Sequence, residues 1–270
     1  MCNSDLSPLV LCIGGHDPSG GAGIQADAEA VRAAGLHAAT IVTCLTAQDT
    51  RGLKGLWPQP PDSVADQCRL ILADSLVKAI KIGLIGNTAL ARWLCQLGDD
   101  YPRIPLILDP VLAAGAGQKI ADAALFDQAE YNLIGRCTLV TPNLPEAQAL
   151  SGAQEPADCA KRILARGCEW VLITGTHDRS PDVINRLYGA DGSEWAWHWP
   201  RLPHEYHGSG CTLASAIAAR LGLGLPMAEA VQEAQAYTWQ SLKTAIRTGR
   251  GQWTPNRLFA LKGPDDPISH

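Results

Sequence analysis

Short apolar runs alternate along the chain with longer stretches in which apolar residues recur at helical spacing. This alternation is typical of an α/β fold, in which helices cover a mostly parallel sheet. Most of the short runs are apolar throughout, as strands buried on both faces must be. The strands predicted in this way are residues 9–13, 39–44, 79–82, 106–108, 138–141 and 170–173.

The intervening segments predict helices, several of which end at a glycine that can serve as a C-terminal cap. These helices are residues 23–34, 62–76, 88–97, 121–134, 156–166, 211–221 and 227–245. No internal repeat, low-complexity tract or long linker interrupts them, so we expect one domain over residues 1–270. The Pro-rich residues 57–61 are expected to form a loop, and residues 265–270 a frayed tail.

Residues 183–188 and 194–199 break the alternation, because they flank an Asp191-Gly192 turn and predict an antiparallel hairpin at the sheet's edge. Period-2 spacing puts Trp195, Trp197 and Trp199 on one face of the second strand. They could pack on the core or form a substrate lid or subunit contact. Aromatic residues fit half-buried strands in general, which favours packing.

Composition and charge exclude several classes of protein. The 270 residues are 46% hydrophobic and 18% charged, which excludes a disordered chain. A net charge of −5 without a Lys/Arg-rich run argues against nucleic acid as a partner. No run has the 18 or more apolar residues of a membrane span, and no signal peptide is evident, so we expect a cytoplasmic protein without membrane contact. The nine cysteines form no C-x-x-C pair, which predicts free thiols and no structural zinc.

Two Gly-rich turns stand where strands give way to helices, the position at which open α/β sheets bind ligands. The first, residues 14–23, has the spacing of neither a Rossmann nor a P-loop fingerprint. Its glycines allow close approach to a ligand, although a plain tight turn is the alternative. The second, residues 207–212, precedes an apolar helix whose N-terminus can bind an anion. Cys211 lies there, and the helix should lower its pKa.

A third turn, residues 141–146, has two interpretations. Asn143 and Glu146 have the spacing of a capping box, with Pro145 in the first helical turn. Glu146 at the sheet's ligand edge could equally hold a hydrated Mg²⁺. Asp109 ends the predicted strand 106–108 and is expected at the same edge, as a ligand for metal or substrate or as a loop cap.

The chain resembles the hydroxymethylpyrimidine and phosphomethylpyrimidine kinases of thiamine biosynthesis, in the ribokinase superfamily. Six motifs carry the resemblance in the family's order, over about residues 11–245. They are DPSGGAGIQAD (17–27), LTAQDTRG (45–52), KIG (81–83), DPV (109–111), TPNLPEA (141–147) and GSGCT (208–212).

The resemblance implies a ribokinase-like three-layer sandwich that uses ATP to phosphorylate 4-amino-5-hydroxymethyl-2-methylpyrimidine, its monophosphate, or both. It implies a pyrimidine site, a phosphate and Mg²⁺ site, and an anion hole with Cys211 as base. It also suggests a homodimer, and leaves open whether K⁺ assists. The residues implied are Gly15, Asp27, Gln48 and Val111 for the pyrimidine; Asn143, Thr174 and Thr212 for ATP and phosphate; Asp109 and Glu146 for Mg²⁺; and Gly208, Ser209, Gly210 and Cys211 for the anion hole.

Two departures from the family pattern leave alternatives open. Many relatives have lysines where this chain has the sequences TGTH (174–177) and GAG (115–117), so positive charge near the expected phosphates is reduced. The number of phosphorylation steps therefore stays open. A pyridoxal or pyridoxine kinase and a non-catalytic pyrimidine-binding protein are the alternative functions.

Overall fold

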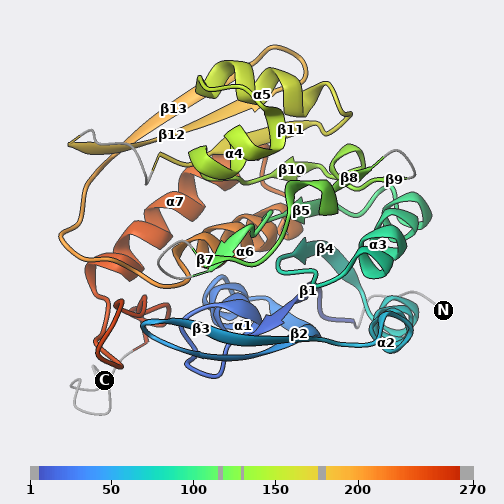
Figure 1. The fold of residues 1–270 in the computed structure, drawn as a ribbon, viewed down its shortest axis with the longest axis horizontal. Helices are drawn as coiled ribbons and strands as arrows, with labels where there is room; N and C mark the ends of the chain where they lie inside the picture. Colours follow the sequence, from blue (N-terminus) through green and yellow to red (C-terminus); the bar gives the residue numbers. More distant parts are fainter. Residues whose placement is uncertain (1–5, 115–117, 129–130, 176–180, 262–270) are drawn as a thin grey trace.

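A computed structural model of the chain describes residues 6–114, 118–128, 131–175 and 181–261 (Figure 1). A nine-stranded sheet forms its centre, with the strand order β13-β12-β11-β10-β5-β4-β1-β2-β3. The strands are β1 Leu9–His16, β2 His37–Asp49, β3 Gly52–Pro58, β4 Val77–Ile82, β5 Leu106–Leu108, β10 Leu139–Val140, β11 Trp170–Ile173, β12 Asp182–Gly189 and β13 Glu194–Pro200. Two small antiparallel pairs lie outside it: β6 Ala113–Ala114 with β7 Gln118–Lys119, and β8 Asp127–Gln128 with β9 Tyr131–Asn132.

The six strands from β11 to β2 in that order run parallel, which confirms the prediction from the apolar runs. The predicted hairpin is also confirmed, because β12 pairs antiparallel with both β11 and β13. A second hairpin, β2–β3, closes the opposite edge of the sheet and was not predicted (Figure 1). The loop expected over residues 57–61 is therefore partly wrong, since Trp57 and Pro58 belong to β3 and pair with Leu45 and Cys44.

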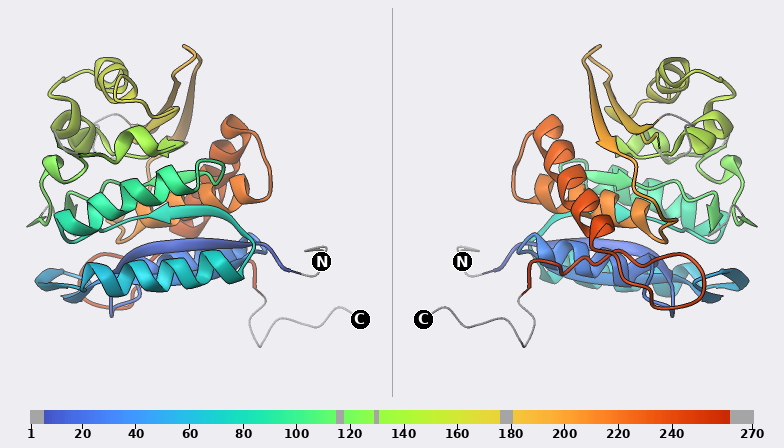
Figure 2. Two further views of the ribbon diagram at one scale, coloured as in Figure 1. Left: turned by 90° about the vertical axis from the view of Figure 1, so that its right-hand side faces the viewer. Right: turned by 90° about the vertical axis from the view of Figure 1, so that its left-hand side faces the viewer.

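Helices cover both faces of the sheet (Figure 2), as the prediction of a three-layer arrangement requires. Apolar side chains of α2, α3, α4 and α5 contribute to one core cluster, and those of α1, α6 and α7 to the other. The helices are α1 Gly23–Ala33, α2 Pro61–Asp74, α3 Thr88–Asp100, α4 Leu144–Ser151, α5 Pro156–Leu164, α6 Ser209–Gly222 and α7 Met227–Lys243.

The helix predicted over residues 121–134 is wrong. In its place lie a short 3₁₀ turn, Ala123–Leu125, and the β8–β9 pair, followed by a second 3₁₀ turn, Ile134–Arg136. The buried residues Phe126, Leu133 and Ile134 are spaced as they would be on one face of a helix, although the segment is not helical. Asn132 competes with helical bonding, because its side chain accepts from Gly135 N and donates to Arg166 O.

The tryptophans of β13 pack on the body of the protein, as the favoured interpretation expected. Trp195 lies 5.7 Å from Trp170 between ring centroids, and Trp199 lies 6.2 Å from Trp239. Trp197 packs against the cluster formed by α1, α6 and α7. The three indole rings therefore pack the hairpin against β11, α7 and the adjoining core cluster.

The eight cysteines within the described residues are all free, as predicted, and only Cys211 among them is not fully buried. Cys2 and the expected frayed tail, 265–270, lie outside the described residues. Over the part of the chain that is described, no helix has the length and apolar character needed to cross a membrane.

Candidate active site

The predicted site residues gather at the carboxyl ends of the parallel strands. β1 leads into the first Gly-rich loop, β5 into Asp109, and β10 into the turn that begins α4. The N-terminus of α6 faces this edge, because a Cβ placed on Gly210 would lie 3.9 Å from both carboxylate oxygens of Asp109. The Cys211 thiol lies near enough to Asp109 for each group to shift the pKa of the other. The Cys211 thiol, the Asp109 carboxylate and the N-terminus of α6 therefore lie together at the carboxyl edge of the sheet.

A buried ion pair between Lys81 and Asp27 lies next to Asp109. Lys81 Nζ is 2.8 Å from Asp27 Oδ1 and 4.0 Å from Asp109 Oδ2. Burial alone would lower the pKa of Lys81, but the negative charges of Asp27 and Asp109 and the neighbouring Cys211 hold it above its ordinary value. Sequence reasoning noted Lys81 only as part of a motif. Its signal was a lysine inside the predicted strand 79–82, whose other residues are apolar, where only a partnered charge is tolerated.

Asp27, which was predicted to line the pyrimidine pocket, has a fully buried side chain. Its Oδ1 accepts from Lys81 and from Ser215 Oγ, the latter at 2.7 Å, while Oδ2 has no partner. Asp27 neutralises Lys81 and positions it under Asp109.

The other residues predicted for the pyrimidine lie around the same edge. Gly15 is buried near the end of β1, and a Cβ there would meet Leu84 at 2.9 Å. Val111 lies two residues after Asp109, and the backbone N–H of Val111 donates to the carbonyl oxygen of Asp109. Gln48 is partly exposed on β2, beyond the point where β1 stops pairing at Leu45.

The prediction of a lowered pKa for Cys211 is wrong. Although the residue keeps some solvent contact, the surrounding protein shields the sulfur, and this desolvation raises the pKa of Cys211 to about 12. Lys81 opposes the rise, while Asp109 and Asp27 add to it. The helix N-terminus is therefore outweighed, and the group is a protonated thiol at neutral pH.

Glu146 and Asn143 form a capping box at the start of α4. Asn143 Oδ1 accepts from Glu146 N at 2.9 Å, and Glu146 Oε2 accepts from Asn143 N at 3.0 Å. Glu146 Oε1 also accepts from Leu112 N at 3.3 Å, which ties the turn to the loop after Asp109. Burial raises the pKa of Glu146 to about 8, and the charge of Asp109 adds to the effect. Thr174 joins the group through a parallel bridge to Asn143.

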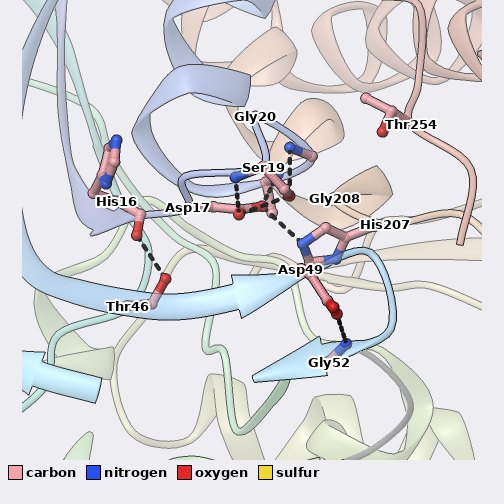
Figure 3. Close-up of polar contacts among 12 residues, drawn as sticks. His16, Asp17, Ser19, Gly20, Thr46, Asp49, Gly52, His207, Gly208 and Thr254 are labelled. Carbon is pink, nitrogen blue, oxygen red and sulfur yellow. Dashed lines mark hydrogen bonds and ion pairs between the residues drawn. The ribbon is translucent and has the colours of Figure 1, made fainter. Parts of the chain in front are cut away.

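The first Gly-rich loop and the turn before α6 are joined by a residue pair that sequence reasoning missed. His207 Nε2 lies 2.8 Å from Asp17 Oδ2, and Ser19 bonds the other oxygen of the same carboxylate (Figure 3). Burial would raise the pKa of Asp17, but hydrogen bonds from His207 and Ser19 outweigh it and lower it to about 2. Both residues lie in sequences that were singled out, yet 190 positions separate them, and spacing alone cannot show such a contact.

Gly208 is required where these two segments meet. Its φ is +83°, and a Cβ at this position would lie 2.0 Å from the Gly21 carbonyl oxygen. Thr212, predicted to bind phosphate, is fully buried. Its hydroxyl donates to Gly208 O and accepts from Arg257 Nε, each at 2.8 Å. The Thr212 side chain therefore stabilises the first turn of α6 from inside the protein.

Comparisons with known proteins match this chain to one family of kinases. The profile of the phosphomethylpyrimidine kinase family covers residues 17–256. A hydroxymethylpyrimidine/phosphomethylpyrimidine kinase of Streptomyces coelicolor is 35% identical over 94% of this chain and 96% of its own length. A thiamine biosynthesis bifunctional protein of Geobacter sulfurreducens is also 35% identical, and the match spans 95% of this chain but 54% of that protein.

Solved structures share the fold. A Bacillus subtilis pyridoxal kinase, solved as an ADP complex, superposes with a TM-score of 0.83 at 25% identity, over 93% of this chain and 97% of that one. A phosphomethylpyrimidine kinase of Clostridium difficile gives 0.75 at 27% identity, over 87% and 99%. These matches confirm the ribokinase-like fold expected from the motifs. With the family profile covering most of its length, this chain belongs to the phosphomethylpyrimidine kinase family.

Proposed function

We propose that this protein uses ATP to phosphorylate the hydroxymethyl group of 4-amino-5-hydroxymethyl-2-methylpyrimidine, its monophosphate, or both, in thiamine biosynthesis. The observation that carries the proposal is the meeting of Cys211, Asp109 and the N-terminus of α6 at the carboxyl edge of the sheet. In the reaction the substrate hydroxyl oxygen bonds to the terminal phosphorus of ATP, and the bond from that phosphorus to the ADP oxygen breaks. Phosphoryl transfer asks the protein for positioning and for stabilisation of negative charge, which a helix N-terminus supplies.

We assign to Cys211 the role of the base that accepts the proton of the substrate hydroxyl. Its thiol lies beside Asp109, and burial raises the pKa of that carboxyl above its ordinary value. The thiol proton leaves to solvent, the positive charge of Lys81 favours the resulting thiolate, and the sulfur then takes the proton of the substrate hydroxyl. Backbone N–H groups of Gly208, Ser209 and Gly210 are assigned to the transferring phosphoryl group.

Asp109 and Glu146 fit Mg²⁺ by the chemistry of their oxygens and by their charge. The charge of Asp109 helps to raise the pKa of Glu146, as expected for two carboxylates that lie near each other. Mg²⁺ prefers such hard oxygen ligands and keeps several waters. When bound, the ion would offset negative charge on the phosphates. Asn143 and Thr174 are assigned to the ATP phosphates. Thr212 is not, because its backbone N–H donates to Gly208 O at 3.0 Å and its side chain is buried. Assistance by K⁺ is a separate question for measurement.

Stability without metal should fall as pH rises from about 4.5 to about 8. The raised pKa means that the folded protein keeps a proton on Glu146 that the unfolded chain has already released, so stability is lost through this window. The slope is at most about 1.4 kcal/mol per pH unit, and less because Glu146 is partly exposed. Urea titrations in EDTA should show this slope, and Mg²⁺ or Glu146→Gln should flatten it. Equal slopes in all three samples would contradict the assignment of the titration to Glu146.

The function is tested by a ³¹P NMR time course with ATP, Mg²⁺ and the aminopyrimidine alcohol. We expect monophosphate product, and diphosphate if both steps occur. Binding of the pyrimidine without phosphorylated product would favour a binding protein. Pyridoxal is a second candidate substrate because of the structural match to pyridoxal kinase, and kcat/KM on it in the same assay decides between the two.

A homodimer and a cytoplasmic location are further parts of this proposal. Leu45 and Trp57, paired across β2 and β3, are 46% and 56% exposed on the edge hairpin. Two large apolar side chains side by side on a surface are typical of an interface. Sedimentation of the wild type and of Trp57→Ser tests it: a dimer that the substitution weakens supports the proposal, and a wild-type monomer overturns it.

A further inference from the structure

Arg257 is the largest side chain among the fully buried residues of the described chain, and it belongs to no motif recognised in the sequence. Its guanidinium makes four hydrogen bonds. Nε donates to Thr212 Oγ1 at 2.8 Å, Nη1 to Gly20 O at 3.2 Å and to Glu29 Oε2 at 3.0 Å, and Nη2 to Gly21 O. One side chain near the C-terminus thus contacts the first Gly-rich loop, α1 and the first turn of α6.

These bonds hold two peptide units of the Gly-rich loop from both ends. The carbonyls of Gly20 and Gly21 accept from Arg257, and the N–H groups of the same two peptide units, on Gly21 and Ala22, donate to Ser19 Oγ and Asp17 Oδ2. Because a peptide unit is planar, fixing its oxygen and its nitrogen fixes its orientation. The loop is clamped between Arg257 and Asp17.

The same two residues also hold α6. Asp17 contacts His207 beside Gly208, and Arg257 contacts Thr212, which follows Cys211 and bonds back to Gly208 O. The loop and the helix N-terminus are therefore linked at two points on either side of residues 208–211. The segment that supplies Arg257 is itself anchored, through hydrogen bonds from Gly251 N and Gln252 N to Thr50 and from His207 N to the Trp253 carbonyl.

We propose that Arg257 is a positioning residue for phosphoryl transfer, which sets the Gly-rich loop and the N-terminus of α6 at their working separation. The inference rests on the proposed kinase function. Misplacement of a reacting group by about 1 Å can cost on the order of 10²-fold in rate. A lysine offers a point charge and cannot reproduce the planar fork that reaches three segments at once.

The test compares Arg257→Ala and Arg257→Lys with Arg220→Ala. Arg220 is a matched control because it is also a largely buried arginine. It bonds Ala216 O within the second half of α6 and Glu233 on α7. We expect kcat to fall about 10²-fold in Arg257→Ala and about 10-fold in Arg257→Lys, with KM for the pyrimidine changed by less than about threefold. Millimolar methylguanidine should restore activity to Arg257→Ala, whereas urea at the same concentration should not. Arg220→Ala should lose stability but keep kcat.

A second readout does not depend on activity. Hydrogen exchange at residues 19–23 and 208–213 should accelerate in Arg257→Ala, return towards wild type with methylguanidine, and stay unchanged in Arg220→Ala. Unchanged exchange and unchanged kcat in folded Arg257→Ala overturn the proposal, and so does an equal kcat loss in an equally destabilised Arg220→Ala. If Arg257→Ala does not fold, Arg257→Lys decides by the same criteria. If the wild type phosphorylates neither substrate but exchange still accelerates in Arg257→Ala, the kinase function is refuted. The role of Arg257 in holding the Gly-rich loop against α6 is then retained.

Discussion

Replacing Cys211 by alanine is expected to lower kcat by roughly 10²- to 10⁴-fold, the usual contribution of a general base. The thiol lies beside Asp109 at the N-terminus of α6, which we propose stabilises the phosphoryl group during its transfer to the substrate hydroxyl. Alanine keeps the helix and removes only the proton acceptor. Pyrimidine binding and the folded structure should therefore be retained. Steady-state kinetics on both variants, with circular dichroism as a check of folding, measure the effect.

Cys159→Ala is the matched control for this substitution. Cys159 is a buried free thiol on α5, on the opposite face of the sheet from α6, so its loss should reduce stability and leave kcat unchanged. Alkylation adds an independent check. With a pKa of about 12, the Cys211 thiol should react slowly with iodoacetamide at pH 7 and faster as pH rises. Wild-type turnover in Cys211→Ala would remove the residue as base, and rapid alkylation at pH 7 would contradict the raised pKa.

The sequence predicted the ligand edge well because its signals are local. A strand that ends in Asp109, a Gly-rich turn that begins a helix, and the Asn143–Glu146 spacing each follow from neighbouring residues. The sheet then brings such positions together by topology alone, since the carboxyl ends of parallel strands meet at one edge. The errors lie where distant residues decide: the pKa of Cys211 is raised mainly by burial, and the charges that act on it belong to Lys81, Asp109 and Asp27 on other segments.

The same reason explains what was missed in the fold. The β2–β3 hairpin needs partners that the strand pattern did not reveal, because Leu45 and Trp57 are apolar yet exposed. The segment 121–134 has helical spacing, but Asn132 takes the hydrogen bonds that a helix would need from the backbone. Arg257 could have been noticed only as an arginine in a short segment with few other charges, which carries no information about its partners.

Replacing Lys81 by methionine should have the largest effect on stability. The substitution leaves Asp27 buried, with one oxygen bonded to Ser215 and the other without a partner, and removes the cation nearest Asp109. Breaking a buried ion pair by deleting one partner typically costs about 3–5 kcal/mol, because the remaining charge has neither water nor counter-ion. Urea unfolding at pH 7 should show that loss, without a change in m-value if the native state stays compact.

The double variant Asp27→Asn/Lys81→Met decides whether that loss comes from the pair or from packing. With both charges removed, no uncompensated charge remains, and the asparagine side chain introduced at position 27 can still accept from Ser215, so much of the stability should return. Activity should not return with it, because Asp109 would still lack the ammonium 4.0 Å away that balances it. A double variant as unstable as Lys81→Met would assign the loss to packing. A fully active one would show that Lys81 serves the fold alone, and the buried charge would then have no part in setting the proton affinity of Asp109 and Cys211.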